Sequence, residues 1–510
     1  MTRGGVALLL LGVWIGSLGW LVRREYFRPS SQLAEASAAT VPPGATFYSV
    51  FMNGTQIGFA SNTVDTVPGG IYVSDILEIF VPVLGSAQRL NAHTKVNLSK
   101  ALQLIGFEAK IEGDANRFVA RGEVLGDSLL AIEITTGERT EMIEVPLREP
   151  VVLPAYLPLR LSFGPGIEVG DSHTVALYDP FTFQEKMVDI AITGDSTFII
   201  PDSAVFDSTA MRWEAIHWDT LYARRIEQHA GGLRTETWID ELGRVVQYRS
   251  PGGFVISRSV YELAYENFRR GHGVGAALQP EVIGQTVIAA NVSLGVDELA
   301  QVRVVLSGTE LNGFQLEGGR QQLIADTLIV TRETPDQLDA DYMLPNLSLR
   351  FAQFVRPEPL IQSDDERLLA LARRIVGRTR NARRAAESIN RWVFEEITKE
   401  VTAGVPNAVR VLENRSGDCN EHTVLFVALA RATGLPTRTA AGLIYINGSF
   451  YYHAWAEVFL GDWVAFDPTL GQTPADASHL RFTVGGLARQ LELTRLIGSV
   501  SLDVVETRNS

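Results

Sequence analysis

The chain has 510 residues, enough for three or four domains at roughly 100–200 residues each. Apolar residues make up 46% of it and charged residues 20%, which excludes a disordered or collagenous chain and favours sizeable buried cores. The net charge of −14 argues against general nucleic-acid binding, because phosphate neutralisation needs surplus cation. The single cysteine, Cys419, excludes an intramolecular disulfide and a multi-cysteine zinc or iron–sulfur site.

An uncharged stretch, residues 4–22, opens the chain between one arginine and a following arginine pair. As a helix it would be roughly 28 Å long, close to a bilayer core of about 30 Å. We therefore expect residues 1–27 to be an uncleaved membrane anchor. The alternatives are a cleavable signal peptide, whose apolar stretch would be about 7–15 residues, and a buried helix of a soluble protein.

Short β-branched and aromatic runs fill the region from Thr46 to about Arg270. Two such runs flank Asn53-Gly54, a pair that supplies the positive φ angles of a tight hairpin. Further runs at 235–240 and 244–248 are separated by a short turn. The region is predicted to form one large antiparallel sheet or a partly open barrel.

Similar runs recur at 301–306 and 327–330 and predict a second, smaller β domain. From Ser363 the pattern becomes helical, since Ser363 to Glu366 has the form of a capping box and apolar residues follow at helical spacing. A glycine-rich segment, 271–275, lacks the Lys-Ser/Thr of a phosphate loop and is predicted to be a linker.

The predicted fold class is α+β, with a transmembrane helix, two antiparallel β domains and a C-terminal domain of helices plus antiparallel sheet. The predicted parts are a membrane anchor (1–27), a tether (28–45), a large β domain (46–270), a linker (271–281), a small β domain (282–360), a catalytic domain (361–485) and a C-terminal tail (486–510).

Cys419 lies where an almost entirely apolar helix is expected to begin, and residues 424–432 of that helix carry a single charge. A helix start presents free amides and the positive end of the dipole, so we expect a lowered thiol pKa. A lone cysteine beside a buried helix is more often a small hydrophobe than a nucleophile. The motifs that follow in the sequence favour the nucleophile.

Three strand runs follow this helix, the first two joined by an Asn447-Gly448 hairpin turn, with His453 in the second run and Asp467 at the end of the third. Three motifs here resemble the transglutaminase-like superfamily, whose papain-like core sets a cysteine-bearing helix against a sheet bearing His and Asp. They are Gly417-Asp-Cys-Asn-Glu-His, His453-Ala-Trp-Ala-Glu-Val and Trp463-Val-Ala-Phe-Asp-Pro-Thr.

The resemblance covers about residues 363–480 and implies Cys419 as nucleophile, His453 as base and Asp467 as the acid that orients the histidine. A thiolate attacking an amide or ester carbonyl forms a thioester, which water hydrolyses and an amine converts to a new amide. These residues alone do not decide between hydrolysis or proteolysis and transamidation. The leading hypothesis is a membrane-tethered cysteine enzyme acting on amide bonds of proteins or peptides.

Two other hypotheses stay open: a catalytically silent transglutaminase-like fold that serves as a binding or assembly module of the cell envelope, and a lipid or polymer carrier built on the large β region. Because the residues of the triad are all present, catalysis is favoured over the silent module.

Four further residues are candidates for supporting roles. The amide of Cys419 at the helix start is expected to face the developing oxyanion. Asn420 and Trp392 are side-chain candidates for the same task. Trp455 and Glu457 alternate with His453 along one strand, and we expect Trp455 to form a packing wall and Glu457 to be a supporting or structural acid.

The connection between the last two strands decides whether Asp467 reaches His453. A two-residue turn at Gly461-Asp462 would place Asp467 opposite Ala456, on the other face of the sheet. The sequence therefore predicts an odd-length turn centred near Leu460, or a bulge.

A protein or peptide substrate and the membrane are the predicted partners, while no nucleic acid, metal or cofactor is predicted. A calcium requirement has little support because no EF-hand-like acidic loop occurs in the sequence. The resemblance places the body outside the cytoplasm, in a bacterial periplasm or cell envelope, although the arginines after the anchor do not fix the orientation. The oligomeric state is not predicted.

Overall fold

The structure is a computed structural model, and it describes residues 41–271 and 287–509 apart from short gaps at 84–85, 114–116, 127, 137–138, 148, 164–167, 182, 231–232, 251–252, 297–298, 335–336, 401–404 and 497–498. The predicted anchor (1–27), most of the tether and nearly all of the linker lie outside the described residues. Within the described ranges, no helix has the length and apolarity needed to cross a bilayer.

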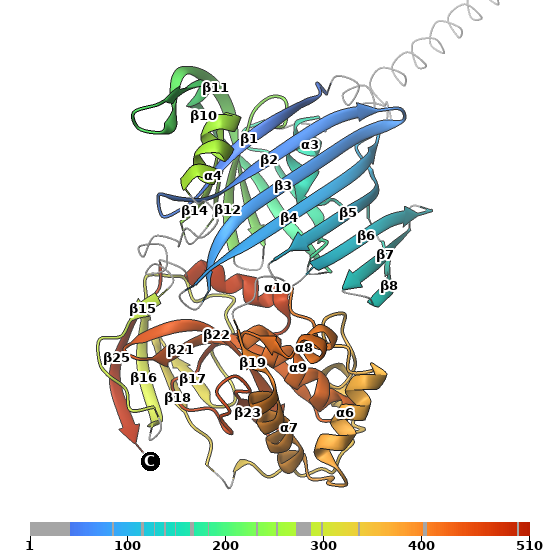
Figure 1. The fold of residues 1–510 in the computed structure, drawn as a ribbon, viewed down its shortest axis with the longest axis vertical. Coiled ribbons are helices and arrows are strands. Elements are labelled where there is room, and N and C mark those ends of the chain that lie inside the picture. Colours follow the sequence, from blue (N-terminus) through green and yellow to red (C-terminus); the bar gives the residue numbers. More distant parts are fainter. Residues whose placement is uncertain are drawn as a thin grey trace, which may run out of the picture.

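A sheet of fourteen antiparallel strands forms the upper part of the molecule in Figure 1. The chain begins in its middle, proceeds strand by strand to one edge at β8, crosses to the other edge at β9, and returns to β14, which pairs with β1. The strands are β1 (Gly44–Met52), β2 (Thr55–Val67), β3 (Gly70–Val83), β4 (Ser86–Ser99), β5 (Leu104–Glu112), β6 (Arg117–Leu125), β7 (Leu129–Thr136), β8 (Arg139–Pro146), β9 (Ser172–Asp179), β10 (Gln184–Asp207), β11 (Arg212–Ala230), β12 (Leu233–Ile239), β13 (Val245–Ser250) and β14 (Phe254–Ser259).

The segment that crosses between the two edges fills the inside of this sheet. It contains the 3₁₀ turn η1 (Pro154–Tyr156) and α3 (Leu157–Ser162), and Tyr156 is fully buried with its hydroxyl donating to the Val151 carbonyl at 2.8 Å. It packs in one hydrophobic cluster with residues of both halves of the sheet, among them Val96 and Ile190. The sheet therefore wraps around a large core, and two smaller clusters lie beside it, one with Val50 and Ile57 and the other with Trp238 and Val246.

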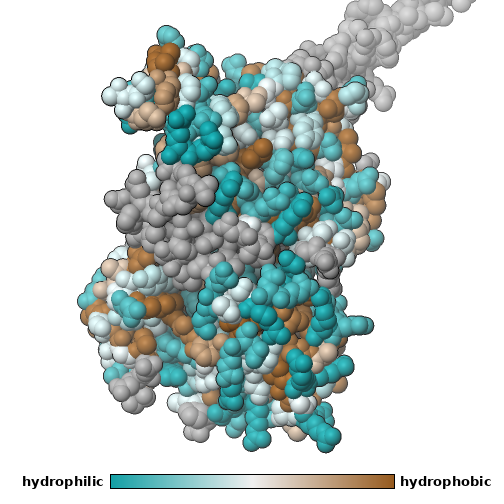
Figure 2. Space-filling model, viewed as in Figure 1, coloured by the Kyte–Doolittle hydropathy of each residue, from teal (hydrophilic) through white to brown (hydrophobic). Residues whose placement is uncertain are grey.

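Two peripheral features complete the upper part. A π-helical turn (Glu262–Glu266) and α4 (Asn267–Gly271) cover β1, β2 and β11. The long β10–β11 hairpin, at the upper left of Figure 1, exposes large hydrophobic side chains, which include Ile199, Ile216 and Trp218. Brown, apolar surface is visible on this part of the molecule in Figure 2.

The lower part combines helices with two further sheets (Figure 1). One sheet has the order β15-β22-β21-β24, with β23 paired to β22, and the other has the order β17-β18-β16-β25. Its strands are β15 (Val287–Ala289), β16 (Leu299–Ser307), β17 (Gln321–Ile324), β18 (Thr327–Thr331), β21 (Thr437–Ile446), β22 (Ser449–Phe459), β23 (Trp463–Phe466), β24 (Leu480–Val484) and β25 (Ser501–Asn509), and a separate parallel pair is formed by β19 (Thr398–Lys399) and β20 (Ser416–Gly417).

Helix α9 lies at the centre of the lower part, packed by α6, α7 and α8 and by strands β21 and β22. Its apolar residues are buried all round, from Val424 to Ala430, as the sequence predicts. The helical elements are η4 (Leu349–Phe354), α6 (Glu366–Val376), α7 (Ala382–Glu396), α8 (Ala408–Asn414), α9 (Cys419–Ala432), α10 (Leu487–Gln490) and η5 (Leu491–Leu496).

The smaller β region and the catalytic region share one hydrophobic core. Val302 and Leu328 of the first pack in the same cluster as Leu443 and Phe482 of the second. Strand β25 lies within the predicted C-terminal tail, yet it pairs with β16 over eight positions. Residues on both sides of the predicted 360/361 boundary therefore share a core, and residues 501–509 of the predicted tail form strand β25 of the smaller sheet.

The two parts of the molecule touch just upstream of Cys419. Val405 belongs to the hydrophobic cluster of the large sheet, and Asn407, which caps α8, donates from Nδ2 to Thr136 Oγ1 at 3.1 Å. The end of β7 thus contacts the segment that leads into α8 and on to the cysteine.

Candidate active site

A capping box fixes the start of α9. The Asp418 carboxylate accepts the amides of Asn420 and Glu421, and the Glu421 side chain accepts the Asp418 amide in return. Gly417 allows this arrangement, because a Cβ at that position would lie 2.2 Å from Glu421 Cβ. Cys419 is the first residue of the helix, as predicted, and the Asp418 carboxylate does not use its amide.

An opening in one edge of β22 receives the thiol. This edge pairs with β15 up to Tyr451 and with β23 from Ala456 onward, so within the described chain the positions between have a strand partner only on the opposite edge, where β21 lies. The Ala454 amide in this interval hydrogen-bonds the thiol of Cys419. The cysteine therefore lies against the strand position that adjoins His453, and it is 5% exposed.

The expectation of a lowered thiol pKa is wrong for this structure. Burial raises the pKa of Cys419 well above its ordinary value, and the Asp418 and Glu421 carboxylates raise it further. The Ala454 amide acts in the opposite direction but does not offset them. The same acidic residues that cap the helix thus counteract the stabilisation that its N-terminus offers to a thiolate.

A three-residue connection joins β22 to β23. Phe459 pairs with Trp463, and the Leu460 amide donates to the Asp462 carbonyl at 2.8 Å. The predicted odd-length turn is confirmed, although its centre is Gly461 rather than Leu460. Because Phe466 pairs with Ala456, the next residue, Asp467, falls on the face of the sheet that carries His453.

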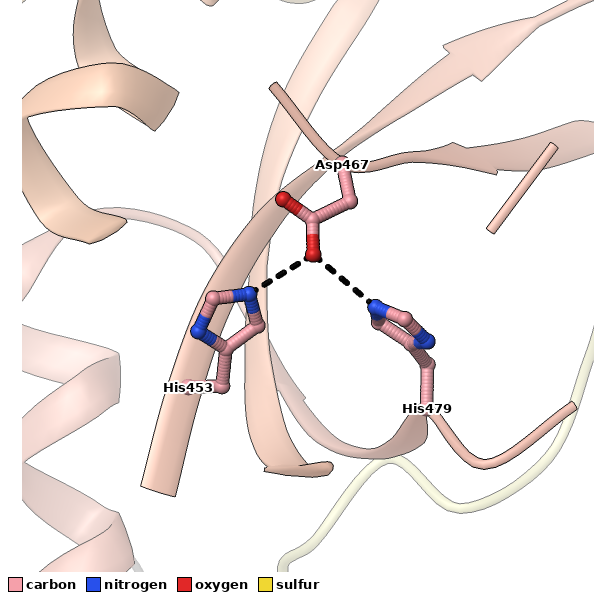
Figure 3. Close-up of side chains that lie close together, drawn as sticks. All are labelled: His453, Asp467 and His479. Atoms are coloured by element: carbon pink, nitrogen blue, oxygen red, sulfur yellow. Dashed lines mark hydrogen bonds and ion pairs between the residues drawn. The ribbon is translucent and has the colours of Figure 1, made fainter. Parts of the chain in front are cut away.

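Asp467 lies between two histidines, as Figure 3 shows. Its Oδ2 is 2.8 Å from His453 Nε2 and 3.0 Å from His479 Nε2, and His479 Nδ1 is 3.3 Å from Asp476 Oδ1. His453 therefore keeps Nδ1 as the ring nitrogen that can take a proton from a thiol. No hydrogen bond joins His453 to Cys419 within the described residues.

Strong electrostatic coupling holds this group together. Burial alone would raise the pKa of Asp467, yet His453 and His479 hold it well below its usual range. Burial likewise opposes the charge on His479, but its bonds to Asp467 and Asp476 raise its pKa to about 9. At neutral pH the group therefore contains an imidazolium at His479 between two carboxylates.

The sequence did not point to His479 or Asp476. Both lie in an irregular segment before β24, and His479 and Asp467 are 12 residues apart. The available signal was a second histidine within a short distance of the triad aspartate, followed by a strand. No known spacing between a triad aspartate and a second histidine predicts a contact, so only the folded chain shows that His479 meets Asp467.

The other candidate residues occupy different positions. Glu457 is buried and forms ion pairs with Arg481 at 2.9 Å and Arg438 at 2.6 Å, which is a structural role. Among the described residues, the side chains of Asn420 and Trp392 make no hydrogen bond to the triad. The Trp392 ring instead stacks with the Arg415 guanidinium, whose Cζ is 4.8 Å from the ring centroid. Their predicted oxyanion role stays a prediction.

Trp455 forms the wall of the site. It is fully buried, with its ring centroid 6.2 Å from that of His453 and 5.2 Å from that of His479. We expect Trp455→Ala to lower the free energy of unfolding by about 3–5 kcal/mol. Trp455→Phe should cost much less, because Nε1 has no hydrogen-bond partner in the described chain. Urea unfolding measures both, and equal losses would contradict a packing role.

His453, Asp467 and His479 also offer donor atoms of the kinds that zinc takes, all within 4.8 Å of one another. Their separations of 2.8 and 3.0 Å are those of charge-assisted hydrogen bonds, so the site as arranged holds protons between its members. We expect prolonged treatment with EDTA to leave the melting temperature and the alkylation rate of Cys419 unchanged. A loss restored by added zinc would instead identify a metal site.

The segment that holds Cys419, His453 and Asp467 is similar to a known protein family. Residues 369–468 match the model of the transglutaminase-like superfamily. The comparison with curated proteins gives no match. Similar solved structures include a candidate cysteine protease from Cytophaga hutchinsonii (16% identity, 44% of this chain, 82% of that chain, TM-score 0.27), a β-barrel-like protein of a domain of unknown function from Brucella abortus (10%, 42%, 94%, 0.31) and a candidate protease from Parabacteroides distasonis (9%, 72%, 68%, 0.20). Residues 369–468, which hold Cys419, His453 and Asp467, therefore form a transglutaminase-like core.

Proposed function

We propose that the transglutaminase-like core is a cysteine enzyme that acts on amide bonds of proteins or peptides through a thioester on Cys419. The observation that carries the proposal is the 2.8 Å bond between His453 Nε2 and Asp467 Oδ2, beside the strand opening that holds the thiol. This bond orients the imidazole and leaves Nδ1 to act as base.

The raised pKa of Cys419 sets the order of events. The resting thiol keeps its proton, so His453 Nδ1 takes that proton as the sulfur attacks the carbonyl carbon. The S–C bond forms, the C–N bond breaks, and the imidazolium returns the proton to the leaving amine. Water or a second amine then attacks the thioester carbonyl and regenerates the thiol. The Cys419 amide at the helix start faces the developing oxyanion.

The direct test is incubation of the protein with a glutamine-containing peptide and a labelled amine, read by mass spectrometry. Amine incorporation, deamidation or peptide cleavage that disappears in Cys419→Ala would support the proposal and assign the acceptor. Substrate left intact by the wild type, across several peptides and simple thioesters, would overturn it.

A catalytically silent binding module is the second candidate, favoured by the burial and raised pKa of the thiol. Alkylation of Cys419 with iodoacetamide at pH 7 separates the two. If His453 takes the thiol proton, His453→Gln slows alkylation at least tenfold. Equal rates in the two proteins would support the silent module.

The proposal includes a membrane tether formed by residues 1–27 and a body on the extracytoplasmic side of a bacterial membrane. Its support is the uncharged stretch of residues 4–22. Protease added to intact spheroplasts is expected to digest the body. Protection of the body until the cells are lysed would contradict this orientation.

A further inference from the structure

The large sheet forms a half-open cavity of about 560 Å³ that the proposed reaction does not use. Its volume lies within the range of natural small-molecule sites, about 300–1,000 Å³. Residues from β1 to β3, residues from β9 to β14 and the segment from Pro154 to Leu159 line it. Most of the lining side chains are apolar; they include Val73, Leu77, Leu159, Val188, Val245 and Ile256.

A close backbone approach shapes one wall of the cavity. The turn between β12 and β13 lies against α3 at Gly243, which has a φ of +69°. A Cβ at Gly243 would lie 2.8 Å from the Leu159 Cα, so only glycine fits here. Gly243 and Leu159 both line the cavity, so this close approach forms part of its wall.

Asp75 places a carboxylate among the mostly apolar side chains of this lining. It alternates with Val73 and Leu77 along β3, on the face that lines the cavity. Its Oδ1 accepts a hydrogen bond from Asn62, while Oδ2 has no partner among the described residues. Burial raises the pKa of Asp75 to about 7, and the bond from Asn62 only partly opposes this.

No cation pairs with Asp75 within the described chain. Two other charged residues line the cavity: Asp179, which accepts the Phe181 amide in its own turn, and Lys186, which is half-buried and forms no ion pair with Asp75. A carboxylate that faces an apolar cavity without a cation is costly, because desolvation is not offset by a partner. A ligand that brings both apolar surface and a positive charge removes that cost.

We propose that this cavity binds a single-chain amphiphile, with the apolar chain against the lining side chains and a terminal ammonium group at the Asp75 carboxylate. Burial of the chain supplies affinity at roughly 25 cal/mol per Å² of apolar surface. The ammonium group donates to the free Oδ2 and supplies the missing counter-charge. The proposal stands on the large sheet alone and does not depend on the chemistry of Cys419.

Calorimetric titration of the full chain at pH 8 with dodecylamine, dodecanol and dodecanoate tests the proposal. We expect dodecylamine to bind at least tenfold more tightly than the other two. Asp75→Asn should abolish this preference, because the side chain keeps its shape and loses its charge. The matched control is Asp65→Asn, at an exposed position of the neighbouring strand β2, which should keep the preference.

A second variant guards against misfolding as an explanation. Leu77→Trp is expected to fill the cavity and remove binding of all three compounds, with the circular dichroism spectrum and the melting temperature monitored. Absence of saturable binding to the wild type, equal affinity for the three compounds, or a preference that survives Asp75→Asn would each overturn the proposal. Cys419→Ala should bind dodecylamine like the wild type, which separates this site from the proposed enzyme.

Discussion

Replacement of Asp467 by asparagine is expected to lower the rate of thioester formation by roughly 10³–10⁴-fold, because His453 loses the carboxylate that sets its tautomer and stabilises its charged form. The variant also loses stability. Asp467 Oδ1 accepts hydrogen bonds from the amides of Thr469 and Leu470, and Oδ2 is within hydrogen-bond distance of both histidines. The NH₂ group of an asparagine cannot accept these hydrogen bonds, whichever oxygen it replaces. With the cation at His479 left short of a partner, about 3–5 kcal/mol of unfolding free energy should be lost.

Rate and stability are measured separately, by single-turnover acylation and by urea unfolding. The matched control is Asp462→Asn, at an exposed position of the three-residue connection, which should change neither quantity. An Asp467→Asn protein with wild-type acylation would remove Asp467 from the proposed triad. One with wild-type stability would show that the histidines do not depend on its charge.

The second large effect concerns alkaline pH. The pKa of His479 is about 9 in the folded protein and near 6.5 when the chain is unfolded. Because the folded value is the higher one, the stabilisation is fully present below pH 6.5 and is lost as pH rises through 9. We expect the free energy of unfolding to fall by on the order of 3 kcal/mol across this window.

The comparison with His479→Gln isolates this effect. The variant should be less stable than the wild type at pH 6 and should change less between pH 6.5 and 9. His217→Gln, at an exposed position of β11, should follow the wild-type curve. Ionisation of the unfolded Cys419 thiol contributes equally to all three proteins and cancels in the differences. Parallel pH curves for His479→Gln and wild type would contradict an imidazolium at this position.

Sequence patterns with local physical causes predicted the structure well. The Asn-Gly turns at 53–54 and 447–448 both form, with all four residues at positive φ, because these residue types tolerate that conformation. The apolar stretch before Gly434 predicted a buried helix with Cys419 at its start. The alternation of side chains along a strand was enough to predict a connection with an odd number of residues before Asp467. A two-residue turn would have placed Asp467 on the face of the sheet opposite His453.

Features that depend on several distant segments were not predictable. The raised thiol pKa follows from burial under neighbouring elements and from the capping carboxylates, whereas the sequence showed only the helix start. His479 meets Asp467 because the chain between them folds back, and no periodic pattern marks that path. The predicted helix cap at Ser363 is wrong: Asp365 caps α6, and its side chain accepts the Arg367 amide. The shared core of the two smaller sheets includes strand β25, which pairs with β16, a strand about 200 residues earlier in the sequence.

The pairing of β25 with β16 also ties the assembly of the site to protein synthesis. Arg303 and its partner Glu506 are 203 residues apart, so β16 leaves the ribosome long before its neighbour exists. Translation at about 5–20 residues per second separates the two strands by roughly 10–40 seconds. During that interval the cluster that contains Cys419 lacks Leu502 and Val504. A nascent chain therefore exposes the edge of β16 that β25 later covers, and the hydrophobic cluster that contains Cys419 is completed only when β25 pairs.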